Sequence, residues 1–169
     1  GVLGVVFRKN RKPPFLNKPR CTAVWDGRFS GNLKRTETDS PLALAAIKDG
    51  RVLLVRDGLG ISPLYYGKVD GSMVFASEVK ALVGIAKQIR EFPPGYKYRS
   101  GEGFQQFFRL KEVPAWPLNE EEAATKLRQA LEHAVARYTE GQAEIGSLLS
   151  GGLDSSTLAA IARTQVERL

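Results

Sequence analysis

The feature that most constrains this chain is a strand–loop–helix unit near its carboxyl end. The apolar run at residues 145–149 predicts a buried β-strand, and an alanine-rich helix is predicted from Thr157 onward. A glycine pair, Gly151 and Gly152, lies in the connecting loop. Such a strand is typical of a parallel sheet, which needs neighbouring strands and cover on both faces. Residues 119–169 cannot supply them, so we expect a second domain that is incomplete or is completed by a partner.

A second helix is predicted before this unit, beginning at a capping box. Asn119 is followed three residues later by Glu122, and Leu118 is placed to pack against Ala123. His133 is interpreted as a surface or packing residue. One face of the helix is apolar and consists of Ala123, Leu127, Ala130, Leu131, Ala134 and Tyr138.

Residues 1–110 have a different pattern and are predicted to be mainly β. Asp-Gly pairs at residues 49–50 and 70–71 predict two hairpins. One helix is predicted at residues 77–86. The predicted strands lie at residues 2–7, 21–25, 42–47, 51–56, 63–66, 73–76, 96–99 and 104–108.

Composition argues against several classes of protein. Hydrophobic content of 43% and charged content of 25% are ordinary for a soluble globular chain, and no apolar run is long enough for a membrane helix. One cysteine argues against a disulfide framework and fits the cytoplasm. One cysteine and one histidine are too few for a structural zinc site, so no protein-held metal is expected. The net charge of +7 lies largely in a proline-broken segment, so nucleic-acid binding is not expected.

The loop between the predicted strand and helix has the chemistry of an anion site. Its glycine pair lets main-chain amides point at an anion, and the helix dipole adds to the attraction. Ser150, Ser155 and Ser156 add hydroxyl donors, whereas Asp154 fits beside phosphate where magnesium bridges the two or where it holds the loop's shape. No Gly-Lys-Ser/Thr follows, which argues against the lysine-bearing nucleotide loop. The glycines alone would also fit a plain strand-to-helix turn.

Residues 148–156 resemble the pyrophosphate loop of the asparagine synthetases. In that family the loop grips the phosphates of ATP while a substrate carboxylate is adenylated, and magnesium neutralises the triphosphate. The resemblance therefore implies ATP binding by Leu149, Ser150, Gly151, Gly152, Asp154, Ser155 and Ser156.

Three further segments, residues 56–66, 75–82 and 92–95, resemble the glutaminase domain of the same family and follow its order. The resemblance is weak only between residues 8 and 40. It implies an α+β chain: an N-terminal-nucleophile hydrolase αββα sandwich at 1–110, a linker at 111–118, and at 119–169 the start of a Rossmann-like α/β ATP-pyrophosphatase domain.

In this family a cysteine at the mature amino terminus attacks the amide of glutamine. The family start is matched from its second residue by Gly1, so the nucleophile is expected immediately before that glycine. Cys21 is internal and is interpreted as a buried strand residue. Asp57 matches the aspartate that holds the α-amino group of glutamine.

The oxyanion element of the family, Asn-Gly, is replaced here by Asp26 and Gly27. An aspartate cannot donate the hydrogen bond that a developing oxyanion needs. The pair and the following Arg28 resemble relatives such as β-lactam and lasso-peptide cyclases, in several of which the glutaminase domain is inert. Active and inert glutaminase halves both remain open.

The function implied by the resemblance is ATP-dependent amide formation on a carboxylate, expected to be aspartate, with ammonia from glutamine. The expected partners are glutamine, aspartate and ATP, with no nucleic acid or membrane; homodimerisation is left open. One alternative is an amide- or lactam-forming enzyme that uses free ammonia or its substrate's own amine. Another is a truncated, non-catalytic protein that binds a partner or senses glutamine.

Overall fold

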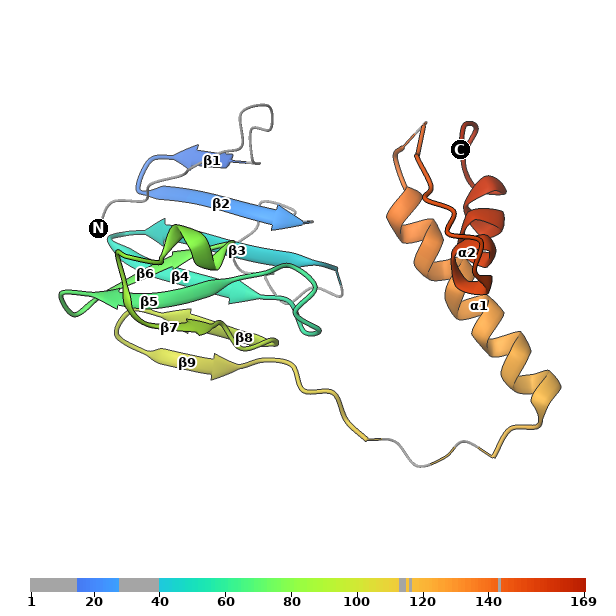
Figure 1. Ribbon diagram of the computed structural model, residues 1–169, viewed down its shortest axis with the longest axis horizontal. Coiled ribbons are helices and arrows are strands. Elements are labelled where there is room, and N and C mark those ends of the chain that lie inside the picture. The colour runs from blue at the N-terminus through green and yellow to red at the C-terminus, as the bar shows by residue number, and fades with distance from the viewer. Residues whose placement is uncertain (1–14, 28–39, 113–114, 116, 143) are drawn as a thin grey trace. The chain divides into compact units, whose positions relative to one another are not determined.

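The computed structural model describes residues 15–27, 40–112, 115, 117–142 and 144–169. The predicted strand at residues 2–7, the motif beginning at Gly1, and Arg28 lie outside these ranges. The chain forms two compact units, Gly1–Glu112 and Val113–Leu169 (Figure 1). At the level of mixed sheets and helices, the predicted α+β class is confirmed.

The described part of the first unit contains two antiparallel sheets. Sheet A has the strand order β1-β2-β3-β4-β8-β9, and sheet B has the order β6-β5-β7. The strands of sheet A are β1 (Phe15–Lys18), β2 (Cys21–Gly27), β3 (Leu42–Lys48), β4 (Arg51–Arg56), β8 (Tyr96–Arg99) and β9 (Gly103–Gln106). Those of sheet B are β5 (Tyr65–Val69), β6 (Ser72–Ala76) and β7 (Lys87–Glu91). Strands β1 and β7 were not predicted.

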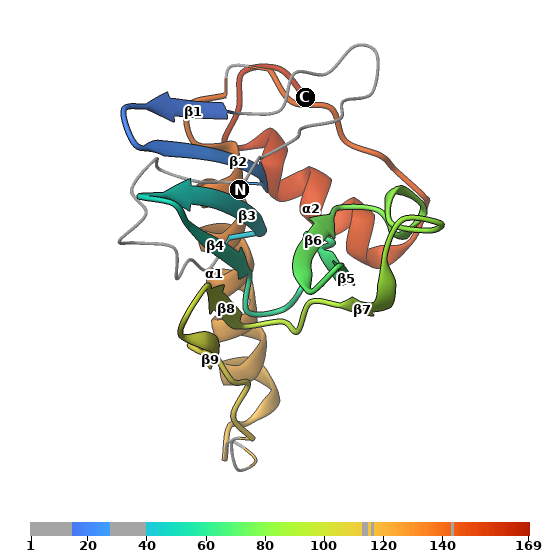
Figure 2. The same ribbon diagram turned by 90° about the vertical axis from the view of Figure 1, so that its left-hand side faces the viewer.

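The core of the first unit lies on both faces of sheet A. Figure 2 shows the two sheets as separate layers, and one buried cluster joins Ala43, Ala45 and Leu54 of sheet A to Leu64 and Phe92. Successive side chains of a strand point to opposite faces, so β3 is buried on both sides. The cluster on the other face contains Ala23, Leu42, Leu44, Ala46, Leu53 and Val55.

Both predicted hairpins are confirmed. Asp49 and Gly50 join β3 to β4, and Asp70 and Gly71 join β5 to β6, with positive φ at all four residues. Two consecutive positive φ angles match the twist of the flanking strands, and Asp-Gly adopts them at little cost.

The helix predicted at residues 77–86 is wrong. The structure has a single 3-10 turn, η1 (Val79–Ala81), whose N-cap, Glu78, makes no side-chain capping bond. Leu82 is buried, but Val83 and Ile85 are exposed, so the apolar pattern has no face to pack against. Gly84 then leaves the helical region with φ of +78°.

The second unit contains helices α1 (Glu120–Thr139) and α2 (Leu153–Arg163). The capping box is confirmed, because the Asn119 side chain accepts from the Glu122 amide at 2.9 Å and the Glu122 carboxylate accepts from the Asn119 amide at 3.2 Å. Helix α2 begins four residues before the predicted start at Thr157. No helix within the described ranges combines the length and apolarity of a transmembrane span.

The strand predicted at residues 145–149 is also wrong. Only Glu144 forms a β-bridge, to Arg168, and the Ile145 amide donates to the Arg168 carbonyl at 3.0 Å. A central strand forms only against neighbours, and the described part of this unit offers no strand to pair with residues 145–149.

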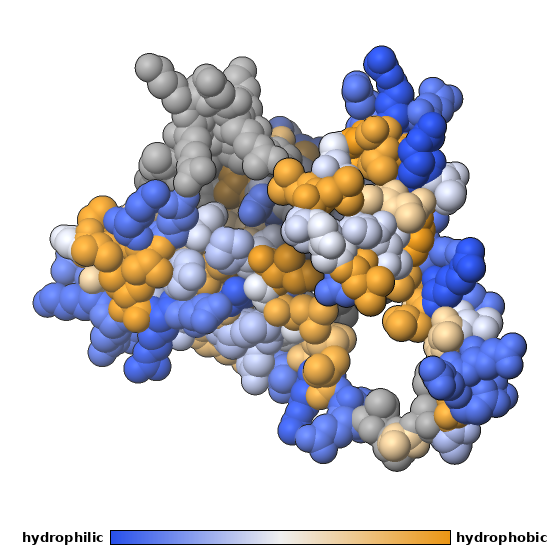
Figure 3. Space-filling view, turned by 45° about the vertical axis from the view of Figure 1, so that its right-hand side comes forward, coloured by the Kyte–Doolittle hydropathy of each residue, from blue (hydrophilic) through white to orange (hydrophobic). Residues whose placement is uncertain are grey.

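Hydrophobic side chains reach the surface of the helical unit (Figure 3). The exposed fraction is 95% for Leu148, 66% for Leu149 and 82% for Leu153. Much of the apolar face predicted for α1 is exposed as well, including Leu127. The buried residues of this unit in the described ranges are Thr139, Ala159, Ala162 and Val166.

Candidate functional site

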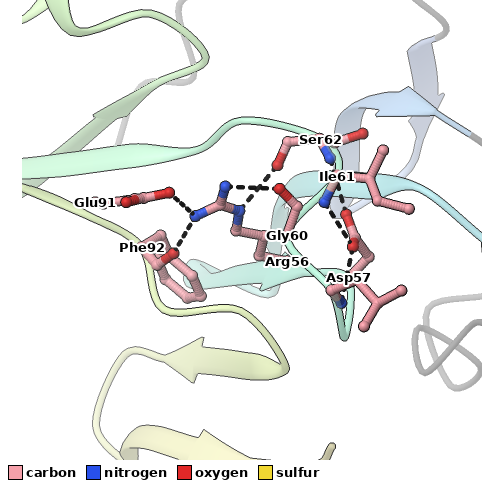
Figure 4. A network of polar contacts seen from close by, with 8 residues as sticks. Arg56, Asp57, Gly60, Ile61, Ser62, Glu91 and Phe92 are labelled. Carbon is pink, nitrogen blue, oxygen red and sulfur yellow. Dashed lines mark hydrogen bonds and ion pairs between the residues drawn. The ribbon is translucent and has the colours of Figure 1, made fainter. Parts of the chain in front are cut away.

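Asp57 follows β4 directly and is buried, with 3% of its surface exposed. Its Oδ1 accepts hydrogen bonds from the amides of Leu59, at 3.2 Å, and Ile61, at 2.9 Å. Its Oδ2 accepts from the amides of Leu42, at 3.2 Å, and Ser62, at 3.0 Å. Figure 4 shows the carboxylate turned toward its own loop. The structure therefore engages this side chain with main-chain donors on two segments.

The environment of Asp57 lowers its pKa. Burial acts to raise the pKa of the carboxyl, because a charge loses hydration inside the protein. Main-chain hydrogen bonds from Ser62, Ile61, Leu42 and Gly60 act in the opposite direction and outweigh burial, so the pKa lies below its ordinary value of 3.8. Asp57 is consequently ionised at neutral pH.

The preceding residue, Arg56, carries the opposite charge to Asp57 and is also buried, with 4% of its surface exposed. Its Nε donates to the Ser62 carbonyl at 2.9 Å, and its Nη2 donates to the Gly60 carbonyl at 2.9 Å. Its Nη1 donates at 2.7 Å both to the Phe92 carbonyl and to the Glu91 carboxylate (Figure 4). Arg56 thereby links the end of β4 in sheet A to the end of β7 in sheet B.

The three predicted glutamine-binding residues lie at one end of sheet A. Gly27 ends β2 and is the strand partner of Leu42. The Leu42 amide donates to the Asp57 carboxylate, and the Leu42 carbonyl accepts from the Asp57 amide. Gly27 has φ of +93°, and a Cβ there would lie 2.0 Å from the Pro41 carbonyl oxygen, so only glycine fits. Asp26 is exposed beside it.

Cys21 lies at the opposite end of β2 from this group and is half-buried, a little more open than predicted. Its strand neighbours are Lys18 on β1 and Lys48 on β3. It lines a shallow cavity of about 550 Å³ with residues of the β1–β2 and β3–β4 turns. The structure therefore does not bring Cys21 to Asp57.

The predicted phosphate loop forms the start of α2. Gly151 has φ of +84°, and Gly152 is the N-cap of the helix. The hydroxyls of Ser150 and Ser155 are 3.0 Å apart, and the Gly152 amide donates to the Ser150 Oγ at 3.4 Å. The Ser155 hydroxyl also lies 3.2 Å from the Gly152 carbonyl, so the two serines close the loop on itself.

The first turn of α2 presents main-chain amides to the outside. The N-cap makes no side-chain capping bond, and the first hydrogen bond into the turn comes from Ser156 to the Gly152 carbonyl at 3.2 Å. The amides of Leu153, Asp154 and Ser155 precede it and belong to the donors that a helix leaves open. Leu149, Gly151 and Asp154 are exposed. This arrangement suits an anion.

Helix α2 is held against α1 by a small polar junction. Gln165, just beyond α2, donates to the Glu132 carbonyl at 3.1 Å, and its Oε1 accepts from the Thr139 hydroxyl at 3.3 Å. Ala159 and Ala162 are buried on α2. These contacts with α1 therefore fix the direction of α2 and the position of the loop at its amino end.

Sequence reasoning missed the contribution of Arg56 and Glu91. Arg56 directly precedes Asp57 in the sequence, but the sequence does not indicate that its guanidinium binds main-chain carbonyls. Glu91 directly precedes the Phe-Pro-Pro-Gly turn. A carboxylate at that place was the one feature of the sequence that could have indicated a cationic partner such as Arg56.

Comparisons with known proteins match two parts of this chain. Residues 20–84 match the glutamine amidotransferase domain family, and residues 126–169 match the asparagine synthase family. The chain is 41% identical over 127 residues to asparagine synthetase [glutamine-hydrolyzing] 2 of Arabidopsis thaliana, covering 72% of this chain and 21% of the relative. It is 39% identical over 119 residues to asparagine synthetase B [glutamine-hydrolyzing] of Escherichia coli K12, covering 69% and 22%.

A solved glutamine phosphoribosylpyrophosphate amidotransferase from B. subtilis has 15% identity and a TM-score of 0.46, covering 95% of this chain and 48% of that one. That likeness is too low to carry a conclusion. The sequence relatives do carry one, although the chain spans only about a fifth of the length of those two. Over about 70% of its own length, the chain is similar in sequence to these glutamine-hydrolysing asparagine synthetases.

Proposed function

We propose that the full-length protein is an asparagine-synthetase-like ligase. It would use ATP to activate a carboxylate, expected to be that of aspartate, and would form an amide with ammonia from glutamine. The observation that carries this proposal is the presence of a glutamine amidotransferase match and an asparagine synthase match in one chain. The expected domains are 1–110, with an αββα hydrolase fold, and 119–169, as the start of an ATP-pyrophosphatase domain, joined by 111–118.

The geometry of the α2 loop supports ATP as the nucleotide substrate. Main-chain amides at a helix start and serine hydroxyls are donors that suit a polyphosphate. The loop supplies one carboxylate, Asp154, so magnesium would be held mainly by phosphate oxygens, as is usual for this ion. Bound ATP would supply the leaving group, while Ser150 and Ser155 would orient the phosphates.

The end of sheet A supports the glutaminase half less fully. Gly27 lies at a glycine-only position, which fits the glycine of an oxyanion element, but Asp26 places a carboxylate where an amide donor is expected. This observation favours a second candidate: an amide- or lactam-forming enzyme with an inert glutaminase domain. That enzyme would use free ammonia or an amine of its own substrate.

The full-length protein tests these candidates. Purified protein with ATP, magnesium and aspartate should release pyrophosphate as the carboxylate is adenylated, and addition of glutamine or ammonium should release AMP and form asparagine. Product with ammonium alone would support the inert-glutaminase candidate. Binding of ATP or glutamine without turnover of either would support the alternative of a non-catalytic binding protein.

The loop assignment has its own variants. Ser150→Ala should raise the KM for ATP by about tenfold, because a phosphate-binding hydroxyl is lost. Thr164→Ala removes a hydroxyl at the opposite end of α2, where it bonds the Ile161 carbonyl, and should leave that KM unchanged. Equal behaviour of the two variants would argue against phosphate binding by Ser150. A cytoplasmic location belongs to the same proposal, which leaves homodimerisation open.

A further inference from the structure

Asp57 uses its full hydrogen-bonding capacity within the protein. A carboxylate offers about four lone-pair directions. In the described structure, four main-chain amides occupy them, from Leu42, Leu59, Ile61 and Ser62. An ammonium group could bind this carboxylate only by displacing a main-chain donor. The hydrogen bonds from Leu42 and Ser62 are buried, so a donor left unpaired there would carry a high cost.

Arg56 completes the restraint on the same segment. Its guanidinium binds the carbonyls of Gly60 and Ser62, while Asp57 binds amides between residues 59 and 62. The donors and the acceptors of this segment are thus held by two consecutive side chains of opposite charge. Gly60 is fitted to this contact, because a Cβ there would lie 3.2 Å from the Arg56 guanidinium carbon and 2.9 Å from Pro94.

Asp57 also contacts Leu42, the strand partner of Gly27. The Asp57 amide donates to the Leu42 carbonyl at 2.8 Å, and the Leu42 amide donates back to the Asp57 carboxylate. Leu42 is the register partner of Gly27, and Gly27 lies against the Pro41 carbonyl. Main-chain atoms therefore connect Asp57 through Leu42 to the end of β2.

We propose that Arg56 and Asp57 are positioning residues, which fix residues 57–62 and, through Leu42, the Gly27 end of β2, and that Asp57 makes no contact with glutamine. The restraint itself follows from the contacts of this unit. Its consequence for glutamine hydrolysis rests on the proposed function.

Amide hydrogen exchange in the full-length protein tests the restraint directly. In Asp57→Asn, the amide group replaces an acceptor oxygen with a donor that faces main-chain N–H groups. Exchange should become at least about tenfold faster in peptides covering residues 57–62 and 40–48, while the β5–β6 hairpin keeps its protection. Asp70→Asn changes an exposed hairpin carboxylate in the same way and should leave both peptides unchanged. Unchanged exchange in Asp57→Asn would overturn the proposal.

Steady-state kinetics of glutamine hydrolysis separate positioning from direct binding. Positioning predicts that Asp57→Asn lowers kcat by about tenfold or more with a change of less than about threefold in the KM for glutamine. Direct binding of the substrate's ammonium predicts a KM raised by more than about tenfold with normal exchange, which would overturn the proposal. If the unmodified protein hydrolyses no glutamine, the proposed function fails in that half, while hydrogen exchange still decides the restraint.

Arg56→Lys provides a second variant if Asp57→Asn does not fold. Lysine keeps the charge but cannot reproduce the planar fork that reaches several acceptors. The expected result is faster exchange at residues 57–62 with normal global stability of sheet A. Protection equal to that of the unmodified protein would contradict the role given to Arg56.

Discussion

The two units differ in how their candidate sites are built. The first unit holds Arg56 and Asp57 at the end of β4. Several of their main-chain partners lie within residues 59–62, but Leu42 and Phe92 lie on segments distant in the sequence. The second unit carries its loop on one helix, and the loop's hydrogen bonds are local. The end of sheet A therefore depends on tertiary structure, whereas the loop's shape is encoded in the residues that surround it.

Core truncation should separate the units most strongly. Phe92 is fully buried between the sheets, so Phe92→Ala in residues 1–169 should cost the first unit about 3–5 kcal/mol of unfolding free energy. Leu153→Ala removes an exposed side chain of the second unit and should change stability by less than about 0.5 kcal/mol. Urea unfolding followed by circular dichroism would measure both. Comparable losses would contradict the difference in packing.

Carboxylate-to-amide changes should show the same asymmetry on a smaller scale. Asp57→Asn should lower the unfolding free energy of the first unit by roughly 2–3 kcal/mol, because buried amides lose a charged acceptor. Asp154→Asn, at an exposed position, should have an effect below about 0.5 kcal/mol. Thermal unfolding of each variant would provide the comparison, and an unaffected Asp57→Asn protein would argue against a structural carboxylate.

Acid should destabilise the first unit through Asp57. Its folded pKa lies below the ordinary value of 3.8, so its stabilising contribution is complete above that value and is lost as the pH falls toward the folded pKa. Unfolding free energy measured from pH 6 downward should therefore decline more steeply for the unmodified protein than for Asp57→Asn. Parallel pH profiles would indicate that Asp57 has the same pKa in both states.

The smallest expected effect is at the capping box of the second unit. Asn119→Ala removes the acceptor for the Glu122 amide and should cost helix α1 about 1 kcal/mol. Hydrogen exchange at the start of α1 should become faster, without a change in the first unit. A larger loss, spread over both units, would show that the two are more strongly coupled than their separate contacts indicate.

Local chemistry made part of this structure predictable. The Asp-Gly turns and the Asn119 capping box were read correctly because each satisfies its own backbone requirement within four residues. The helix prediction at residues 77–86 is wrong because apolar residues at helical spacing form a helix only where they can pack against a core. Residues 145–149 were misread because a strand needs a partner strand.

The hydrogen bonds of Asp57 could not be predicted from the sequence for a related reason. Its motif was recognised, but the Leu42 amide that binds it lies on another strand, and Phe92, a partner of Arg56, lies on another segment again. Only the folded arrangement shows that the carboxylate is already saturated. The glycine and serine pattern of the predicted phosphate loop, in contrast, indicated a turn into a helix whose donors lie within a few residues of each other. The helix is confirmed, whereas the strand before it is not.

The proposed function requires that one polypeptide moves nitrogen from glutamine to an ATP-activated carboxylate. Full-length protein supplied with glutamine labelled by ¹⁵N in its amide, aspartate, ATP and magnesium tests it in a single mass-spectrometric measurement. We expect asparagine carrying ¹⁵N in its side-chain amide, formed together with AMP. ATP left unconsumed and no labelled asparagine would contradict it.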